Sequence, residues 1–592
     1  MKTLFLFFCS GLSLLIPTTR GVPITGGLPT VRGADCDRPC YEADSFHCIF
    51  NWRIVNQFLD CSGETDDCYG DGTPRQATLV SDAEYNNFSI PGPAITVCQG
   101  DEVSVTVVNN LELDTTTIHW HGLPMRNTQV SDGGPGVTQC PIQPGQEFSW
   151  YNFHADTPGT YWYHSHNEFQ RDDGMYGPVI IREPLVAGSC DMTEHTIMIQ
   201  EWYYNTAQHR FTHDKEERPT SLLVNGVGRQ SGAITPWQVF SVHPDICSSY
   251  RFRLVSSVSL HCPIIFSIEE HSFTVIATDG EYLVPEEKVS SLTLANGERF
   301  DILIDVSQHK ERSYVMRFGG SPGEFANCKD LSALAFLQYG QSHVDQSLEP
   351  DYDECISVPG RHVNPVPTVE LPPNQLPVTV TQLHSRYTLD QTQPADKTFY
   401  LLFGDGERGA HVNNIQFDLN TLTTPLLTAE EPDSARLCDE LYAREGLLCD
   451  PNTDKHGCAC HNILHVNTGD VVEMFLINPD LERPIAHPFH LHGYFFNVIG
   501  SGSIPQEDPM TYVRQLNEEG RIERNLEDPP RKDSIQTSPG GYLLIRFYAD
   551  NPGYWLMHCH ISFDVIEGQA MVLRVGDRDE WDIPQGFPEC GK

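Results

Sequence analysis

The sequence has few positive charges for its size. Its 592 residues include 38 lysines and arginines against 80 aspartates and glutamates, a formal net charge of −42. A chain this acidic repels nucleic acid and anionic lipid surfaces, so we expect neither as a partner. After residue 16 the chain also lacks an apolar run of the ~18 residues that a membrane helix needs. We therefore expect no membrane span.

The N-terminal residues have the pattern of a secretory signal peptide. Lys2 precedes the apolar run LFLFFCSGLSLLI, and the small residues Thr19 and Gly21 fit a cleavage site after Gly21. We expect residues 1–21 to be this signal and the mature protein to be secreted to the extracellular space, where cysteines pair. Of 19 cysteines, setting aside Cys9 in the signal and Cys559 in a candidate site leaves 17. Because this number is odd, at least one is unpaired or intermolecular.

Two groups of cysteines predict disulfide-stapled loops. Five lie near the mature N-terminus and four lie between Cys438 and Cys460. The first group is Cys36, Cys40, Cys48, Cys61 and Cys68. A single glycosylation sequon, Asn87-Phe88-Ser89, predicts a glycoprotein only weakly.

Helical periodicity is scarce, and the chain has the pattern of an all-β protein. Short alternating runs such as VSVTVVNN, RFDILIDV and YLLIRFYAD are separated by Gly, Pro, Asn and Asp, as in sandwiches and barrels. A proline-rich stretch at 358–377 predicts an extended linker. The predicted organisation is a signal at 1–21, a cysteine-rich extension at 22–71, domains at 72–185 and 186–345, a linker at 346–375 and a last domain at 376–592.

An internal repeat links the first and last domains. IHWHG at 118–122 matches FHLHG at 489–493, and the segment ending ADTPGTYWYHSH matches the one ending ADNPGYWLMHCH. In both copies a proline stands six residues before an HxH pair: Pro158 before His164, and Pro552 before His558. The two domains are therefore predicted to be copies of one β-unit, each with two HxH pairs.

The four HxH pairs predict a metal site. On a strand, residues i and i+2 point to the same face, so each pair aims two imidazoles at one place. One pair would be weak evidence, whereas four pairs in matched repeats indicate shared metal ligation. Eight imidazoles exceed the four ligands that zinc prefers, and a cluster of copper ions fits best beside a cysteine. The eight are His119, His121, His164, His166, His490, His492, His558 and His560.

A second site is indicated next to this cluster. A blue electron-transfer copper needs two histidines, a cysteine and a weak axial group. His487, three residues before His490, and Cys559 supply one histidine and the cysteine. The backbone of His558, Cys559 and His560 would connect that copper to the cluster.

The motifs HWHG, HSH, HPFHLHG and HCHI resemble the four signatures of the multicopper oxidases, the laccase family. The likeness runs from about residue 85 to the C-terminus and includes SDGGPGVTQCPI. The segments CDRPCYEADSFHC and CACHNILHV are similar to those of arthropod laccases. The resemblance implies three cupredoxin-like β-sandwich domains of Greek-key type. It also implies a trinuclear copper cluster between the first and last domains, and oxidation of a phenol or metal ion coupled to reduction of O₂ to water.

The resemblance also implies roles for individual residues. His119 and His490 would hold the type 2 copper, and the other six histidines the type 3 pair, about three coppers in all. Asp132 matches an acidic residue that lies near the cluster in members of the family, where it would supply protons. Cys140 would pair with Cys590.

The sequence departs from the family pattern at the type 1 site. After HCH the pattern runs I-x-x-H-x-x-x-G and then Met or Leu, but this chain has Asp564 and Gln569 at the histidine and axial positions. In this it resembles insect multicopper oxidase-related proteins. A hard carboxylate and a stronger axial ligand favour Cu(II) and lower the potential. The imidazole edge that receives the donor's electron is also missing.

The sequence allows three interpretations of the type 1 site. The first is a copper-loaded protein with weak or lost laccase activity and a structural or binding role. The second is a working oxidase with a low-potential site, reducing O₂ with an easily oxidised small donor such as ascorbate, a catechol or a metal ion. The third is zinc at Cys559, His487 and Asp564, whose ligand types suit a redox-inert tetrahedral site.

Overall fold

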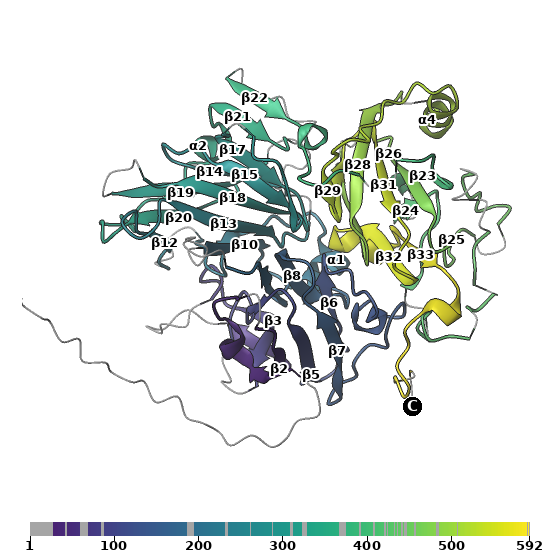
Figure 1. The fold of residues 1–592 in the computed structure, drawn as a ribbon, viewed down its shortest axis with the longest axis horizontal. Helices are drawn as coiled ribbons and strands as arrows, with labels where there is room; N and C mark the ends of the chain where they lie inside the picture. Colours follow the sequence, from purple (N-terminus) through teal and green to yellow (C-terminus); the bar gives the residue numbers. More distant parts are fainter. Residues whose placement is uncertain are drawn as a thin grey trace, which may run out of the picture.

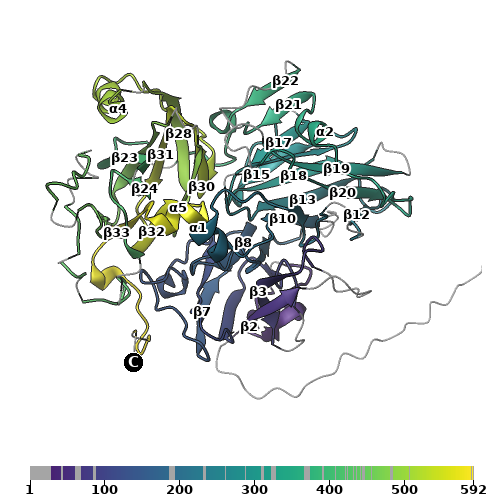
Figure 2. The same ribbon diagram turned by 180° about the vertical axis from the view of Figure 1, so that it is seen from behind.

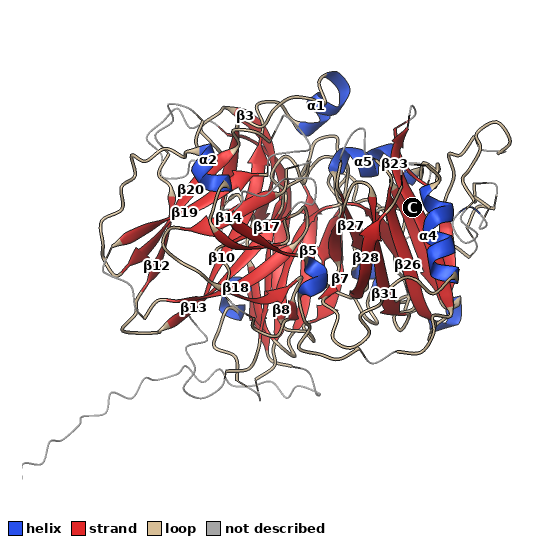
Figure 3. Ribbon diagram, turned by 90° about the horizontal axis from the view of Figure 1, so that it is seen from above, coloured by secondary structure: helices blue, strands red, loops and turns tan. Residues whose placement is uncertain are grey.

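The protein consists mainly of strands, arranged as six sheets in three layered units (Figures 1, 2 and 3). None of its described helices is long and apolar enough to cross a membrane. The predicted signal, Asn87, Cys61 and Cys68 lie outside the described residues. The computed structural model describes residues 28–590 except 42–43, 60–68, 84–87, 186–193, 231–234, 261, 287, 308–311, 322–327, 366–373, 390–391, 407–408, 420–421, 423, 431, 435, 440–441, 443–446, 455–456, 481–484, 506 and 589.

The first unit is a sandwich of a five-stranded and a four-stranded sheet. The five-stranded sheet contains β1 (Thr30–Arg32), β2 (His47–Leu59), β3 (Arg75–Asp82), β5 (Glu102–Asn109) and β7 (Glu147–His154). The four-stranded sheet contains β4 (Ile95–Cys98), β6 (Ile118–His121), β8 (Gly159–Ser165) and β9 (Tyr176–Arg182). The predicted extension at 22–71 therefore contributes strands to this sandwich: β2 pairs with β1, β3 and β5. Its alternating burial makes it part of the core, which the cysteine pattern obscured.

The second unit joins a six-stranded and a seven-stranded sheet. The first holds β10 (Glu194–Trp202), β11 (Ser221–Val224), β13 (Ser249–Ser256), β15 (Thr274–Thr278), β16 (Glu281–Tyr282) and β18 (Arg299–Asp305). The second holds β12 (Gln238–Val242), β14 (Ile264–Ile268), β17 (Ser291–Leu294), β19 (Ser313–Gly320), β20 (Ser332–Tyr339), β21 (Gly360–Val363) and β22 (Gln375–Val378).

Two stretches of the predicted linker are strands of this second unit. β21 pairs with β17 and β22 pairs with β21, so β22 forms the edge of the seven-stranded sheet. The prediction of an extended linker was wrong for these residues. Proline is tolerated on an edge strand, where the missing N–H is not needed by a neighbour; Pro377 occupies such a position.

The third unit pairs a six-stranded with a five-stranded sheet. The first contains β23 (Lys397–Gly406), β24 (Gly409–Val412), β26 (Val471–Asn478), β28 (Phe496–Ser503), β29 (Arg531–Lys532) and β31 (Gly541–Tyr548). The second contains β25 (Ile463–Val466), β27 (His487–Leu491), β30 (Ser534–Thr537), β32 (Gly553–Cys559) and β33 (Ala570–Val575).

Short helices connect some of the strands. α1 and α5 face each other between the second and third units, where the rings of Phe211 and Phe563 lie 5.2 Å apart (Figure 2). Within the described residues the α-helices are α1 (Ala207–His213), α2 (Tyr352–Ile356), α4 (Pro509–Glu518) and α5 (Ser562–Glu567). The described 3₁₀ turns are η1 (Gly33–Cys36), η2 (Gln129–Ser131), η3 (Val380–Gln382) and η5 (Arg578–Glu580).

One large apolar core extends through the first and third units, whereas most buried apolar side chains of the second unit form a separate cluster. A single cluster of contacting buried side chains includes Trp120 and Tyr163 of the first unit and Phe489 and Trp555 of the third. Such a shared core fixes the two units against each other.

The disulfides match most of the cysteine predictions. Cys36–Cys48, Cys438–Cys460 and Cys449–Cys458 staple loops within the two predicted groups, whereas Cys40 pairs outside its group with Cys98. Cys140 bonds Cys590, as the resemblance implied, and joins the first unit to the C-terminal tail. Cys355 is buried and forms no disulfide among the described residues.

Candidate metal centre

The repeat places its HxH pairs on matching strands. β6 pairs antiparallel with β8, with His119 opposite His164, and β27 pairs in the same way with β32, with His490 opposite His558. Directly opposed residues of an antiparallel pair share a face. Each unit therefore presents a patch of imidazoles, and the two patches face each other across the interface.

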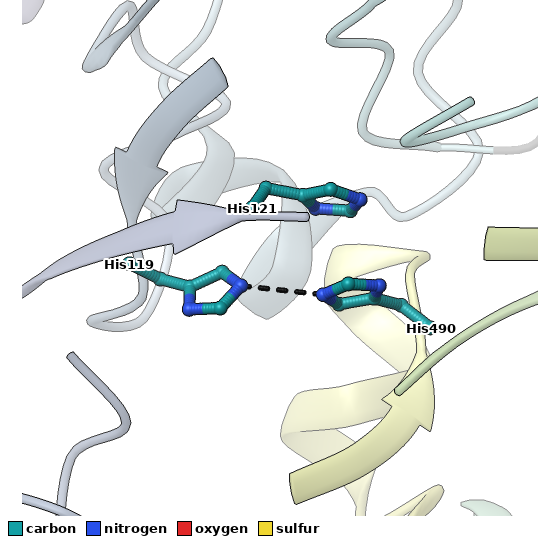
Figure 4. Close-up of side chains that lie close together, drawn as sticks. All are labelled: His119, His121 and His490. Atoms are coloured by element: carbon teal, nitrogen blue, oxygen red, sulfur yellow. Dashed lines mark hydrogen bonds between the residues drawn. The ribbon is translucent and has the colours of Figure 1, made fainter. Parts of the chain in front are cut away.

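The eight predicted histidines come together in three groups of donor atoms, each with its atoms within 4.8 Å of one another. His119 and His490 face each other with their Nε2 atoms 3.2 Å apart (Figure 4). Nε2 of His558 lies 3.3 Å from that of His166 and 3.2 Å from that of His492. The groups are His119, His121 and His490; His121, His164 and His560; and His166, His492 and His558.

The hydrogen bonds behind the rings leave lone pairs aimed at the centre. Nδ1–H of His119 donates to the carbonyl of Asp132 at 2.8 Å, and that of His490 donates to the carbonyl of Asp533 at 2.9 Å. A ring that donates from one nitrogen keeps a lone pair on the other. The two Nε2 atoms at 3.2 Å then carry facing lone pairs, which repel unless a cation lies between them. This arrangement fits metal ions and their supporting hydrogen bonds.

Two further rings keep the same pattern, and one reverses it. Nδ1 of His164 and of His558 each lies within 2.8 Å of a backbone carbonyl. His121 instead directs Nε2 to Asp533 Oδ1 at 3.1 Å, and its buried Nδ1 has no hydrogen-bond partner in the described part of the chain. His121 is therefore oriented to offer Nδ1 as its ligand atom.

Burial keeps seven of the eight imidazoles neutral. It lowers the pKa of His492 to about 3, assisted by the neighbouring His119. Burial is also the main cause that lowers the pKa of His121, His164, His166, His490, His558 and His560. Neutral imidazole is the form that binds a metal ion.

Asp132 lies against two of the rings, as the sequence predicted. Its Oδ2 accepts a hydrogen bond from Nδ1–H of His492 at 2.9 Å. Burial opposes ionisation of this carboxyl, but His492 and His119 hold its pKa well below the usual range. The next residue, Gly133, has φ +89°, and a Cβ there would lie 1.8 Å from the carbonyl oxygen of Ile118. The loop therefore needs glycine in order to bring Asp132 against β6.

Sequence reasoning missed Asp533, the acidic residue that contacts both His121 and His490. Arg299 of the second unit pairs with Asp533 through both terminal nitrogens. Burial opposes the charge on Asp533, but Arg299 holds its pKa well below the usual range. Lys532 is buried between Asp279 at 3.1 Å and Glu298 at 3.2 Å. No sequence motif marks the contacts of Asp533, because its partners His121 and Arg299 lie in the first and second units.

Arg171 is a second residue that sequence reasoning missed. Its Nη1 lies 2.9 Å from Nδ1 of His560, and its Nη2 donates to the carbonyl of His560 at 2.9 Å. A cavity of about 390 Å³ opens beside it and reaches His164, His166 and His558. Phe169, Phe211, Val565 and Ile566 give the cavity an apolar wall.

The predicted type 1 residues also meet, at the junction of β27, β32 and α5. Cys559 Sγ lies 3.7 Å from His487 Nδ1 and 3.3 Å from Asp564 Oδ2, and the last two atoms are 3.1 Å apart. All three residues are buried. Gln569 is fully buried, and among the described residues neither the oxygen nor the nitrogen of its amide group has a hydrogen-bond partner.

Comparisons with known proteins agree with this arrangement. Three family models, each described as multicopper oxidase, match residues 71–185, 193–342 and 421–579. The chain is 30% identical to Laccase-1 of Fomitopsis schrenkii, over 87% of this chain and 85% of the relative. It is 26% identical to L-ascorbate oxidase of Cucurbita pepo var. melopepo, over 85% of this chain and 93% of that one. The crystal structure of Fet3p, a multicopper oxidase that functions in iron import, superposes with a TM-score of 0.68 at 24% identity, covering 91% of this chain and 93% of that chain.

Proposed function

The chain belongs to the multicopper oxidase family, and we propose that it is a secreted member with a complete trinuclear copper site and an impaired type 1 site. Its activity as a laccase is then weak or absent. The observation that carries this proposal is the contrast between the two sites. All eight cluster histidines converge in three groups, whereas a carboxylate stands beside Cys559 and His487.

The eight histidines would hold about three copper ions. His119 and His490 suit one ion, and the groups that contain His560 and His558 suit the other two. When bound, copper takes up single electrons and supplies them to O₂ for its reduction to water. The protein's part is to keep the imidazoles neutral, to orient their lone pairs and to limit the access of water.

Hydrogen-bonded groups around the rings support these tasks. Asp132 accepts the hydrogen bond from Nδ1–H of His492 through Oδ2, and its lowered pKa keeps it a carboxylate that fixes the orientation of this ring. The cavity lined by Phe169, Phe211 and Val565 offers a small apolar molecule such as O₂ a route to His166.

The impaired type 1 site follows from the chemistry of its ligands. A thiolate with two imidazoles suits rapid electron transfer by copper, whereas a carboxylate stabilises Cu(II) and lowers its potential. Asp564 also lacks the imidazole edge through which a donor's electron would enter. Each additional ~1.4 kcal/mol of barrier slows the reaction tenfold.

Purified secreted protein tests the proposal. We expect about three coppers per chain, no intense blue thiolate-to-copper band, and oxygen uptake with phenols near the background rate. Absence of copper from protein made in copper-replete medium would contradict the complete cluster. A strong blue band with rapid oxygen uptake from ascorbate, a catechol or a metal ion would instead favour a working low-potential oxidase.

A further inference from the structure

Cys559, His487 and Asp564 form a compact set of three different ligand types. They come from β32, β27 and α5, and no more than 6% of any of the three residues is exposed. We propose that they bind a redox-inert divalent cation of the zinc type, with the amide oxygen of Gln569 as the fourth ligand. This inference rests on the proposed function, in which the type 1 position no longer carries electrons.

The distances within the set suit a tetrahedral ion. Zinc bonds of about 2.3 Å to sulfur and 2.0–2.2 Å to nitrogen or oxygen place neighbouring ligand atoms about 3.3–3.6 Å apart. Here the sulfur–nitrogen distance is 3.7 Å, the sulfur–oxygen distance 3.3 Å and the nitrogen–oxygen distance 3.1 Å. Each pair is within a few tenths of an ångström of the tetrahedral value, so small side-chain rotations complete the geometry.

Gln569 supplies the second, independent observation. Its carbonyl accepts the backbone N–H of Cys559 at 3.0 Å, which continues the antiparallel pairing of β32 with β33. Directly opposed residues of such a pair share a face, so the Gln569 side chain lies on the face of Cys559. Its amide is fully buried, and neither Oε1 nor Nε2 forms a hydrogen bond with any residue that the structure describes. A buried amide without a partner is costly, and ligation through Oε1 removes that cost for the oxygen.

The ligand set favours zinc over a blue copper. Blue copper sites use two imidazoles and a thiolate in a trigonal arrangement with a weak axial group. Here a hard carboxylate takes the place of one imidazole. A thiolate, an imidazole and oxygen ligands, all from the protein, make the closed tetrahedral site typical of structural zinc.

The position of this ion gives it a structural role. Cys559 lies between His558 and His560, which belong to two different groups of cluster ligands. An ion bonded to Cys559 and to Asp564 of α5 would anchor the backbone of both histidines. Zinc would then support the copper cluster without exchanging electrons with it.

Metal analysis and zinc-edge X-ray absorption of the secreted holoprotein test the inference. We expect about one zinc per chain, with one sulfur and three nitrogen or oxygen neighbours. Asp564→Asn and Cys559→Ser should each lower bound zinc at least about tenfold. Asp550→Asn is the matched control, because this carboxylate of the third unit pairs with Arg126 and is 42% exposed; its zinc content should equal that of the wild type.

The outcomes separate this inference from the proposed function. About three coppers without zinc, or zinc without a sulfur neighbour, overturns the inference alone. Zinc bound through sulfur in a protein without copper supports the inference and contradicts the complete copper cluster. A fourth copper with an intense blue band overturns both. The absorption measurement needs only the wild-type protein, so the test holds even if a variant fails to fold.

Discussion

At the scale of single residues, Asp564 and Gln569 account for the proposed impairment of the type 1 site. We predict that Asp564→His combined with Gln569→Met produces a blue copper site and faster phenol oxidation. Imidazole Nδ1 and carboxylate Oδ are equally far from Cβ, and His487 and Cys559 already lie beside this position. The added ring volume is the main obstacle, since overpacking typically costs about 1–3 kcal/mol. The measurements are the absorption spectrum and oxygen uptake beside wild type.

The double variant would refute our account of the site if it folded, carried full copper and stayed colourless. The defect would then extend beyond these two residues. Asp564→His alone is the intermediate control, because it supplies the imidazole and keeps the amide of Gln569.

Gly133 provides a second prediction at this scale. Gly133→Ala should reduce copper binding and stability, because its Cβ would collide with the backbone of Ile118, next to His119. Gly145→Ala is the matched control: Gly145 also has positive φ, +76°, but a Cβ there meets nothing within 4 Å. Copper content and thermal unfolding of the two variants separate the collision from the cost of the backbone conformation. Equal losses in both would contradict the packing argument.

The histidines that come together could be predicted from the sequence, and so could the position of Asp132, but the supporting residues Asp533 and Arg171 could not. The spacing of each HxH pair requires only that a strand alternates its side chains. Asp533 and Arg171 have no such local signal. Asp533 lies 43 residues from His490 in the sequence, and Arg171 reaches His560 from the first unit into the third.

At the scale of elements, the register of β6 with β8 and of β27 with β32 repeats the internal duplication of the sequence. Alternating runs predicted many of the strands, since one face of each strand is buried. β21 and β22 were predicted as linker, because proline and polar residues on an edge strand resemble an extended connection. β2 was missed for a different reason: its cysteine-rich surroundings suggested a separate extension. The domain limits derived from the sequence remain predictions.

The ion pair that links β18 to the start of β30 gives a prediction at the element scale. Arg299 opens β18, and its partner Asp533 directly precedes β30. Arg299→Ala should destabilise the protein by about 3–5 kcal/mol, because it leaves a buried carboxylate without its cation. The measurement is denaturant unfolding with copper bound.

Arg299→Lys serves as the control for this prediction. It keeps the charge but lacks the planar fork that contacts both carboxylate oxygens. Its loss of stability should be smaller than that of the alanine variant. Wild-type stability in Arg299→Ala would show that the ion pair does not hold the second unit against the metal centre.

At the scale of the whole molecule, the buried imidazoles couple stability to pH. Their pKa values are lowered in the folded state, so below the ordinary value of 6.5 the unfolded chain takes up protons that the folded chain does not. Stability of the metal-free protein is therefore highest above pH 6.5 and falls as the pH is lowered towards 3. For His492 alone the loss at pH 5 is about 2 kcal/mol.

Urea unfolding of metal-free protein at several pH values between 7.5 and 4.5 checks this prediction. The midpoint should move steadily to lower urea as the pH falls. Copper-loaded protein should start from a higher midpoint, because a ligand that binds only the folded state stabilises it. A midpoint that rises with acid would show that the imidazoles are protonated in the fold.

The bond between Cys140 and Cys590 joins two cysteines 450 residues apart and closes a covalent ring that contains six of the eight histidines of the metal centre, all except His119 and His121. A protease that cuts one surface loop inside this ring opens the chain without releasing a fragment. The nicked protein would keep its full mass until a reductant is added, and its histidine-bearing strands would remain tethered at high local concentration. Copper could then reassemble the centre from two peptides. In an extracellular setting rich in proteases, a cleaved molecule of this kind would still be a metalloprotein.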